Sequence, residues 1–104
     1  MYGIKIQSEY NDLDKYQYRN GKIIYYKKNT DIWHNPYGPA FISNDGSKSY
    51  WIENKRSRLN GPAVILFDGK EFYYINGKQL SKEEFEVHPE RLKFLGKEHL
   101  LCLK

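Results

Sequence analysis

The sequence has very little cysteine and no long apolar stretch. Its 104 residues include one cysteine, Cys102, so an internal disulfide is excluded and a reducing compartment is expected. No apolar run approaches the roughly 18 residues that a membrane-spanning helix needs. Residues 1–10 also lack the basic start and apolar run of a secretory leader. We therefore expect a cytoplasmic protein that does not enter a membrane.

Residues that could carry catalysis or bind a metal are equally scarce. His99 and Cys102 have the i, i+3 spacing that could bring both to one ion from a helix, but third and fourth ligands are missing. The serines fall in expected turns and caps, and no strand-to-helix nucleophile elbow is present. The glycines are dispersed and form no phosphate-binding cluster. The sequence thus predicts a non-enzymatic protein with no catalytic residue, metal site or cofactor.

Aromatic residues, in contrast, are abundant. They make up 16% of the chain and include ten tyrosines, whereas hydrophobic residues reach only 39%. Each ring can bury a large area, so we expect a thin sheet built on rings, within a single domain spanning residues 1–104. The net charge of +4 permits attraction to an acidic protein surface or to nucleic acid and requires neither.

Two stretches of the chain have nearly the same sequence, 23 residues apart. The matching phrases are Gly38-Pro39-Ala40 and Gly61-Pro62-Ala63, Asp45-Gly46 and Asp68-Gly69, and Tyr50-Trp51-Ile52 and Tyr73-Tyr74-Ile75. We name these stretches the first copy, which begins at His34, and the second copy, which begins at Ser57. A fixed period of this length indicates a repeated unit that buries its apolar face against its neighbour.

Each copy predicts a β-hairpin whose turn is its Asp-Gly pair. Strands are expected at residues 40–43 and 48–53 in the first copy, and at 63–67 and 70–75 in the second. Two-residue turns would pair small residues with large rings, namely Ala40 with Trp51 and Ala63 with Tyr74. The other face would then pair Phe41 with Tyr50 and Val64 with Tyr73.

The two ends of the chain predict simpler elements. Residues 1–33 predict a strand at 1–6, a turn-rich break at 11–14 and a hairpin at 15–28 with Asn20-Gly21 as its two-residue turn. After the two copies at 34–80, Ser81 and Glu84 form a capping box. Helices are expected at 82–87 and 89–95, and 100–103 could be helix or strand. We expect residues 81–104 to cover one face of the sheet.

The phrase Gly-Pro-Ala, then Asp-Gly, then Asn-Gly-Lys resembles the variant MORN-type repeats of many bacteriophage and giant-virus proteins. The end of the second copy, Asn76-Gly77-Lys78-Gln79-Leu80 and the following residues to Phe85, resembles the typical final unit. The resemblance implies a mainly β (α+β) fold, an antiparallel β-hairpin meander of tandem 23-residue repeats. Members use their sheets to contact proteins or lipids. Tyr37 and Glu53-Asn54 depart from the pattern.

The candidate binding residues are aromatic or basic: Tyr37, Tyr50, Trp51, Tyr73, Tyr74, Lys55, Arg56 and Arg58. Tyr, Trp and Arg are enriched at protein-binding hot spots. The same residue types can stack bases and hold phosphates. The third interpretation is structural, with rings that form the core and charges that keep strand edges soluble.

Our main functional prediction is a small protein-binding module. The resemblance implies a phage or viral protein that docks on a host protein or defence system and inhibits it in the host cytoplasm, as anti-CRISPR proteins do. Two alternatives stay open. One is a nucleic-acid-binding protein that uses a basic, aromatic sheet surface, and the other is a structural module that forms homo-oligomers through an exposed strand edge.

Overall fold

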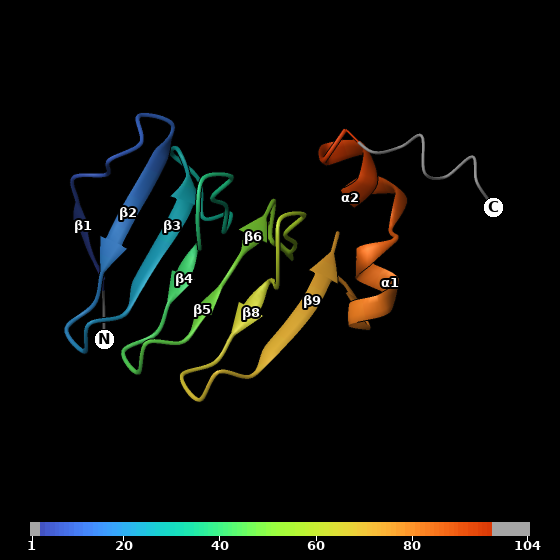
Figure 1. Cartoon of the computed structure of the whole chain (residues 1–104). Helices are drawn as coiled ribbons and strands as arrows, with labels where there is room; N and C mark the ends of the chain where they lie inside the picture. Colours follow the sequence, from blue (N-terminus) through green and yellow to red (C-terminus); the bar gives the residue numbers. More distant parts are fainter. Residues whose placement is uncertain (1–2, 97–104) are drawn as a thin grey trace.

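The protein is mainly antiparallel β-sheet with a short helical segment at its C-terminal end (Figure 1). The computed structural model describes residues 3–96. The eight-stranded main sheet contains β1 (Ile4–Ile6), β2 (Leu13–Gln17), β3 (Ile23–Lys27), β4 (Phe41–Ile42), β5 (Lys48–Ser49), β8 (Val64–Ile65), β9 (Glu71–Ile75) and β10 (Lys78–Leu80). A two-stranded sheet contains β6 (Trp51–Ile52) and β7 (Lys55–Arg56). The helices are α1 (Lys82–Glu86) and α2 (Pro89–Phe94).

The strands of the main sheet lie in chain order, and all of their pairings are antiparallel. Between β5 and β8 the chain leaves the main sheet to form the β6–β7 hairpin. The prediction of a mainly β fold with a helical C-terminal segment is confirmed. Among residues 3–96, no helix is long and apolar enough to span a bilayer.

The three glycine turns lie where the sequence predicted them, but each loop is one residue longer than expected. In the first copy Ser43 donates its N–H to Ser47 O at 2.8 Å, which leaves three loop residues. Gly46, the last of them, has φ of 93°. The same arrangement joins Leu66 to Lys70 and Tyr18 to Lys22. A three-residue loop with a left-handed glycine at its end is a common hairpin connection.

The longer loops shift the strand register by one residue, so the predicted pairings are wrong. Phe41 lies opposite Ser49 instead of Tyr50, and Val64 lies opposite Phe72 instead of Tyr73. In the leading hairpin, Ile23 pairs with Gln17. Because side chains alternate between the two faces of a strand, this shift changes which residues share a face.

One face of the sheet therefore collects rings, and we name it the aromatic face. It is defined by a row of residues in register across six strands: Tyr16, Ile24, Phe41, Ser49, Val64 and Phe72. The Trp33 ring extends the row, with its centre 5.4 Å from that of Phe41 and 5.0 Å from that of Trp51. These rings are half-buried, and Trp33 joins the rings of Phe41 and Trp51 into one packed group.

The tightest packing lies in the N-terminal part of the sheet. Leu13, Tyr25 and Ala40 form a buried cluster, against which Tyr10 and other partly buried residues pack. Leu13 is 1% exposed and begins β2, so the prediction of a turn-rich break through residues 11–14 was wrong at Leu13 and Asp14. Burying a leucine side chain is favourable enough to extend the strand over turn-forming neighbours.

Three buried or half-buried polar side chains support tight turns. Asp14 Oδ2 accepts the N–H of Asn29 at 2.9 Å, His34 Nδ1 accepts that of Glu53 at 3.1 Å, and Ser57 Oγ accepts that of Asn76 at 3.0 Å. The three donor residues have φ of 61°, 51° and 53°, respectively. Each acceptor thus satisfies a backbone group at a left-handed turn residue.

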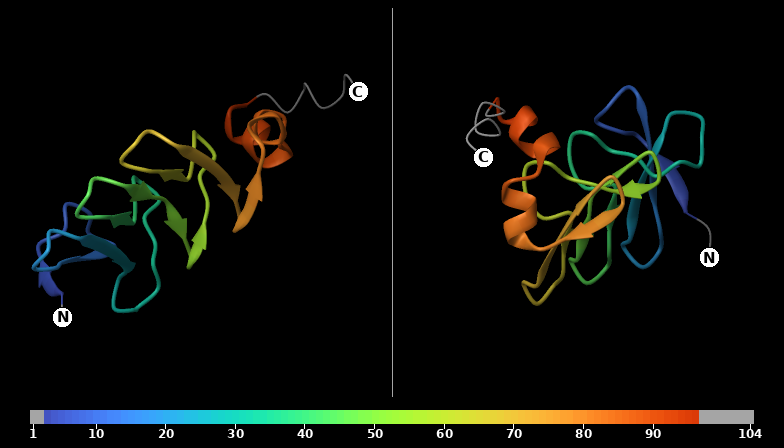
Figure 2. Two further views of the ribbon diagram at one scale, coloured as in Figure 1. Left: turned by 90° about the horizontal axis from the view of Figure 1, so that it is seen from below. Right: turned by 90° about the vertical axis from the view of Figure 1, so that its right-hand side faces the viewer.

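The C-terminal helices form almost as predicted. Ser81 and Glu84 make the expected capping box at the start of α1, and Pro89 is the first residue of α2. However, the helices stand at the end of the sheet beside β9 and β10 and do not spread over a face (Figure 2). The reason is local: the Phe85 ring packs 4.7 Å from that of Tyr73 in β9. Residues 97–104, including the open assignment of 100–103, lie outside the described residues.

Candidate binding site

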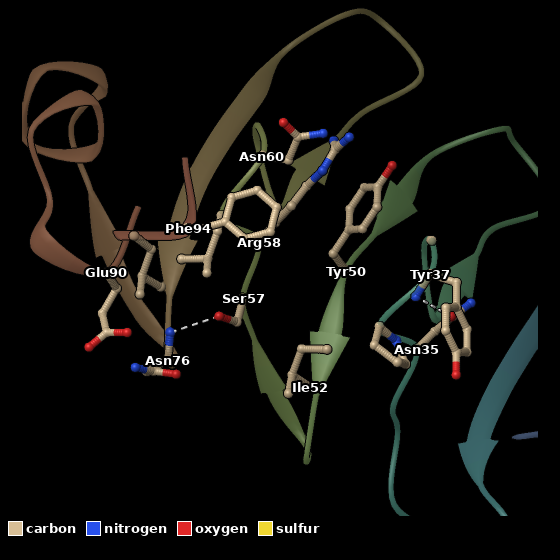
Figure 3. Close-up of a pocket in the computed structure, with 14 residues that line it drawn as sticks. Asn35, Tyr37, Tyr50, Ile52, Ser57, Arg58, Asn60, Asn76, Glu90 and Phe94 are labelled. Carbon is tan, nitrogen blue, oxygen red and sulfur yellow. Dashed lines mark hydrogen bonds between the residues drawn. The ribbon is translucent and has the colours of Figure 1, made fainter. Parts of the chain in front are cut away.

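A cavity of about 420 Å³ opens between three segments that are distant in the sequence. They are the loop at residues 35–38, the stretch at 57–60, and α2 (Figure 3). We name this cavity the groove. Tyr37 and Phe94 line it and are 56% and 57% exposed. Its volume lies in the range of small-ligand and side-chain pockets.

Arg58 is the charged centre of the groove. Its guanidinium lies 4.0 Å from the centre of the Tyr50 ring, a favourable cation–π contact. Within the described chain the Arg58 side chain makes one hydrogen bond, from Nη1 to Pro62 O at 3.1 Å. Arg58 forms no ion pair with an acidic residue among residues 3–96. The groove therefore contains a half-buried positive charge that these residues do not neutralise.

Asn35 has the same place in the first copy that Arg58 has in the second. The backbone N–H of Asn35 donates to Trp51 O, and that of Arg58 donates to Tyr74 O, 23 residues later. Asn35 Nδ2 also donates to Pro39 O at 3.0 Å, which matches the bond from Arg58 to Pro62 O. A neutral amide thus suffices for this structural bond, and the charge of Arg58 is additional to it.

Tyr37 forms a firmly held wall of the groove. Its ring stacks on Tyr10 with centres 4.7 Å apart, and its hydroxyl donates to Asp12 Oδ2 at 2.9 Å. The hydrogen bond to the Asp12 carboxylate raises the pKa of the Tyr37 hydroxyl. The tyrosine therefore stays neutral at physiological pH.

The opposite wall comes from α2. Phe94 is near the end of this helix, and Glu90 is in its first turn, where its N–H donates to His88 Nδ1 at 3.2 Å. In Figure 3 the Glu90 carboxylate points away from Arg58, whereas Asn60, Arg58 and Tyr50 lie side by side at one end of the groove. The groove thus has one end rich in hydrogen-bond donors, and the rest of its lining combines apolar side chains with Asn35, Ser57, Asn76 and Glu90.

Trp51, Arg56 and Tyr74 form a second group, separate from the groove. The Arg56 guanidinium lies 5.2 Å from the Trp51 ring centre and 5.5 Å from that of Tyr74. Trp51 also donates from Nε1 to Ser49 Oγ at 2.7 Å, and its ring contacts the aromatic face. Both rings therefore have a face in contact with Arg56 and are partly occupied by internal packing.

The eight predicted binding residues are consequently divided among several places. Tyr37, Tyr50 and Arg58 meet in the groove. Trp51, Arg56 and Tyr74 form the second group. Tyr73 packs against Phe85 of α1, and Lys55 is exposed beside Gly77.

Sequence reasoning missed Asn35, Asn60 and Phe94, which also line the groove. Of these three, only Asn60 could have been identified from the sequence, because the two copies differ at its position: the first has Tyr37 and the second has Asn60.

Comparison of the chain with protein-family models, curated proteins and solved structures gave no match. Within residues 3–96, no group of three or more His, Cys, Asp or Glu side chains is placed to hold a metal ion. The weak candidates His99 and Cys102 lie outside the described residues. The geometry of the groove is therefore the main guide to function.

Proposed function

We propose that this protein is a non-enzymatic binding module that docks a partner protein in the groove. The observation that carries the proposal is the half-buried charge of Arg58, which has no acidic partner among residues 3–96, between the exposed rings of Tyr37 and Phe94. Aromatic anchors around an arginine are typical of protein-binding hot spots.

A protein partner is favoured over nucleic acid by the state of the rings. Stacking of bases needs free ring faces. Arg58 lies over Tyr50, and Arg56 lies against both Trp51 and Tyr74. A base could not stack on the ring faces that these guanidinium groups cover unless it displaced them. A concave groove with a single positive charge suits a protein side chain better than a phosphate backbone.

We further propose that the two copies are structural repeats of the variant MORN type. The matched bonds of Asn35 and Arg58 support this proposal, as do those of His34 and Ser57. The sequence resemblance supports a phage or viral origin and a host protein or defence factor as the partner. Inhibition would then occur by masking the partner's surface, as with anti-CRISPR proteins, and would need no chemistry.

Affinity capture from host lysate with matched variants tests the proposal. Phe94→Asp places a charge in the groove, whereas Phe67→Asp makes the same change at a hairpin tip, where Phe67 is 72% exposed. We expect the wild type and Phe67→Asp to capture the same protein and Phe94→Asp to lose it. Equal capture by all three proteins would contradict docking in the groove. Binding of DNA or RNA with a steep salt dependence would favour the nucleic-acid alternative.

A further inference from the structure

We infer that the groove recognises an acidic side chain with an apolar side chain two residues before it and another two residues after it. The acidic group would bind at Arg58, and the apolar groups would pack against Tyr37 and Phe94. This inference rests on the proposed function and defines the chemistry of the partner segment. In an extended segment, residues two apart project to the same side, so all three side chains would enter the groove together.

The first argument is the unused capacity of Arg58. A guanidinium carries five N–H donors, and the Arg58 side chain makes one hydrogen bond within the described chain. Its ring contact with Tyr50 leaves the edges of the guanidinium free to form hydrogen bonds in its plane. Carboxylates fit this edge with two parallel hydrogen bonds. Asn35 shows that the scaffold does not require the charge.

The second argument is the arrangement of the groove around Arg58. Figure 3 shows the Asn60 amide and the Tyr50 ring beside the guanidinium. The Asn60 amide adds further N–H donors at this end of the groove. Figure 3 also shows Phe94 on one side of this cluster and Tyr37 on the other. An internal segment would cover both rings, whereas a chain that ended at Arg58 would leave one ring bare. We therefore choose an acidic side chain over a C-terminal carboxylate.

The apolar walls provide the remaining affinity. Ile52 and Leu59 line the groove together with Tyr37 and Phe94. Glu90 is the acidic residue of the lining, and it points away from Arg58 in Figure 3. A ligand carboxylate at Arg58 is thus not placed against the carboxylate of Glu90.

The test is an NMR titration of the full-length chain with capped pentapeptides. The probes are acetyl-Leu-Ser-Glu-Ser-Leu-amide and the same peptide with Gln in place of Glu. We expect the Glu peptide to shift the Arg58 Nε–H and Phe94 amide resonances. The Gln peptide should bind about ten- to hundredfold more weakly, the usual difference for hydrogen bonds to a charged group.

The matched variant is Arg58→Asn, which gives the second copy the residue of the first. It should remain folded, because Asn35 makes the equivalent bond to Pro39 O. It should also bind the two peptides equally weakly, while Arg58→Lys should keep part of the preference for Glu. Equal binding of both peptides to the wild type, binding of neither, or an unchanged preference in Arg58→Asn would each overturn the inference.

The two proposals can fail separately. If lysate capture depends on Phe94 and the peptides do not discriminate, the function as a docking module stands and the acidic motif is wrong. If the Glu peptide binds selectively and no partner is captured, the chemistry of the groove stands and the host-directed function is wrong. A third probe, acetyl-Leu-Ser-Gln-Ser-Leu with a free C-terminal carboxylate, tests the choice of an internal segment. Tighter binding of this probe than of the capped Glu peptide would overturn that choice.

Discussion

The first and second copies share their backbone bonds and differ in the side chains that make the supporting contacts. His34 and Ser57 each accept an N–H from a left-handed turn residue. Asn35 and Arg58 each donate to a proline carbonyl four residues later. Imidazole and hydroxyl are interchangeable for the first task, as are amide and guanidinium for the second. The scaffold therefore specifies a hydrogen-bonding role more strictly than a residue type.

At two pairs of positions 23 residues apart, an arginine follows a neutral residue. Trp33 accepts the N–H of Asn54 through its carbonyl, as Arg56 does for Gly77. Trp33 packs on Phe41, whereas the Arg56 guanidinium lies between the two rings of Trp51 and Tyr74. Arg56, immediately before the second copy, thus corresponds to Trp33, and Arg58, within it, corresponds to Asn35. Of these two arginines, Arg58 lines the groove, and its charge is available for binding.

The largest expected loss of stability comes from substituting the alanines that the copies have in common. Ala40 and Ala63 are both 0% exposed, so a leucine at either position has no space. We expect Ala40→Leu and Ala63→Leu each to lower the free energy of unfolding by about 3 kcal/mol, measured by urea denaturation. Lys48→Leu, an exposed strand position, should change it by less than about 0.5 kcal/mol. If leucine lowered the free energy of unfolding at only one of the two alanines, the two copies would not be packed equivalently.

A smaller effect is expected at Asp14, which supports the turn that follows β3, as His34 and Ser57 support turns in the copies. The N–H of Asn29, with help from Lys5, lowers the pKa of the Asp14 carboxyl. Its contribution to stability is therefore present above its unfolded-state pKa of about 3.9 and is lost as the pH falls through the folded-state pKa.

Asp14→Asn should lower the free energy of unfolding by about 2 kcal/mol at neutral pH. The loss should shrink below pH 4, approximately where the unfolded-state carboxyl is protonated. Urea denaturation at pH 7 and pH 3 measures both effects. A loss of equal size at the two pH values would show that the charge of Asp14 is not what supports this turn.

The smallest effect is expected at Ser57, the counterpart of His34. Ser57→Ala leaves the N–H of Asn76 without its acceptor and should cost about 1 kcal/mol. His34→Ala should cost a similar amount through Glu53. Ser43→Ala, whose hydroxyl bonds the exposed side chain of the neighbouring Asn44, is the control and should be nearly neutral. If Ser57→Ala left the free energy of unfolding unchanged while His34→Ala lowered it, the two positions would not be equivalent.

The sequence predicted the elements of this fold well and their register poorly. The Asp-Gly and Asn-Gly pairs located the turns, and Ser81 with Glu84 located α1. A two-residue and a three-residue loop with a late glycine have similar sequences, so the one-residue difference could not be read from Asp45-Gly46. This difference in loop length decides whether Phe41 pairs with Tyr50 or, as observed, with Ser49.

The groove could be predicted only in part. Tyr37, Tyr50 and Arg58 were identifiable because rings and arginines are typical of binding surfaces and because Tyr37 departs from the repeat pattern. Their meeting with Phe94 depends on how α2 is placed by the packing of Phe85 on Tyr73. Such contacts between distant segments follow from tertiary packing and leave no mark in the local sequence.

The chain-order sheet has a consequence for how this protein could change in length. Strands of the main sheet pair only with the strands beside them (Figure 1). A further 23-residue segment inserted between β5 and β8 would therefore need no new kind of contact, since each end would meet the partner it already has. The groove, in contrast, is lined by both copies and by α2, so such an insertion would move Tyr37 away from Phe94. Selection for binding would thus fix the number of copies even where folding would not.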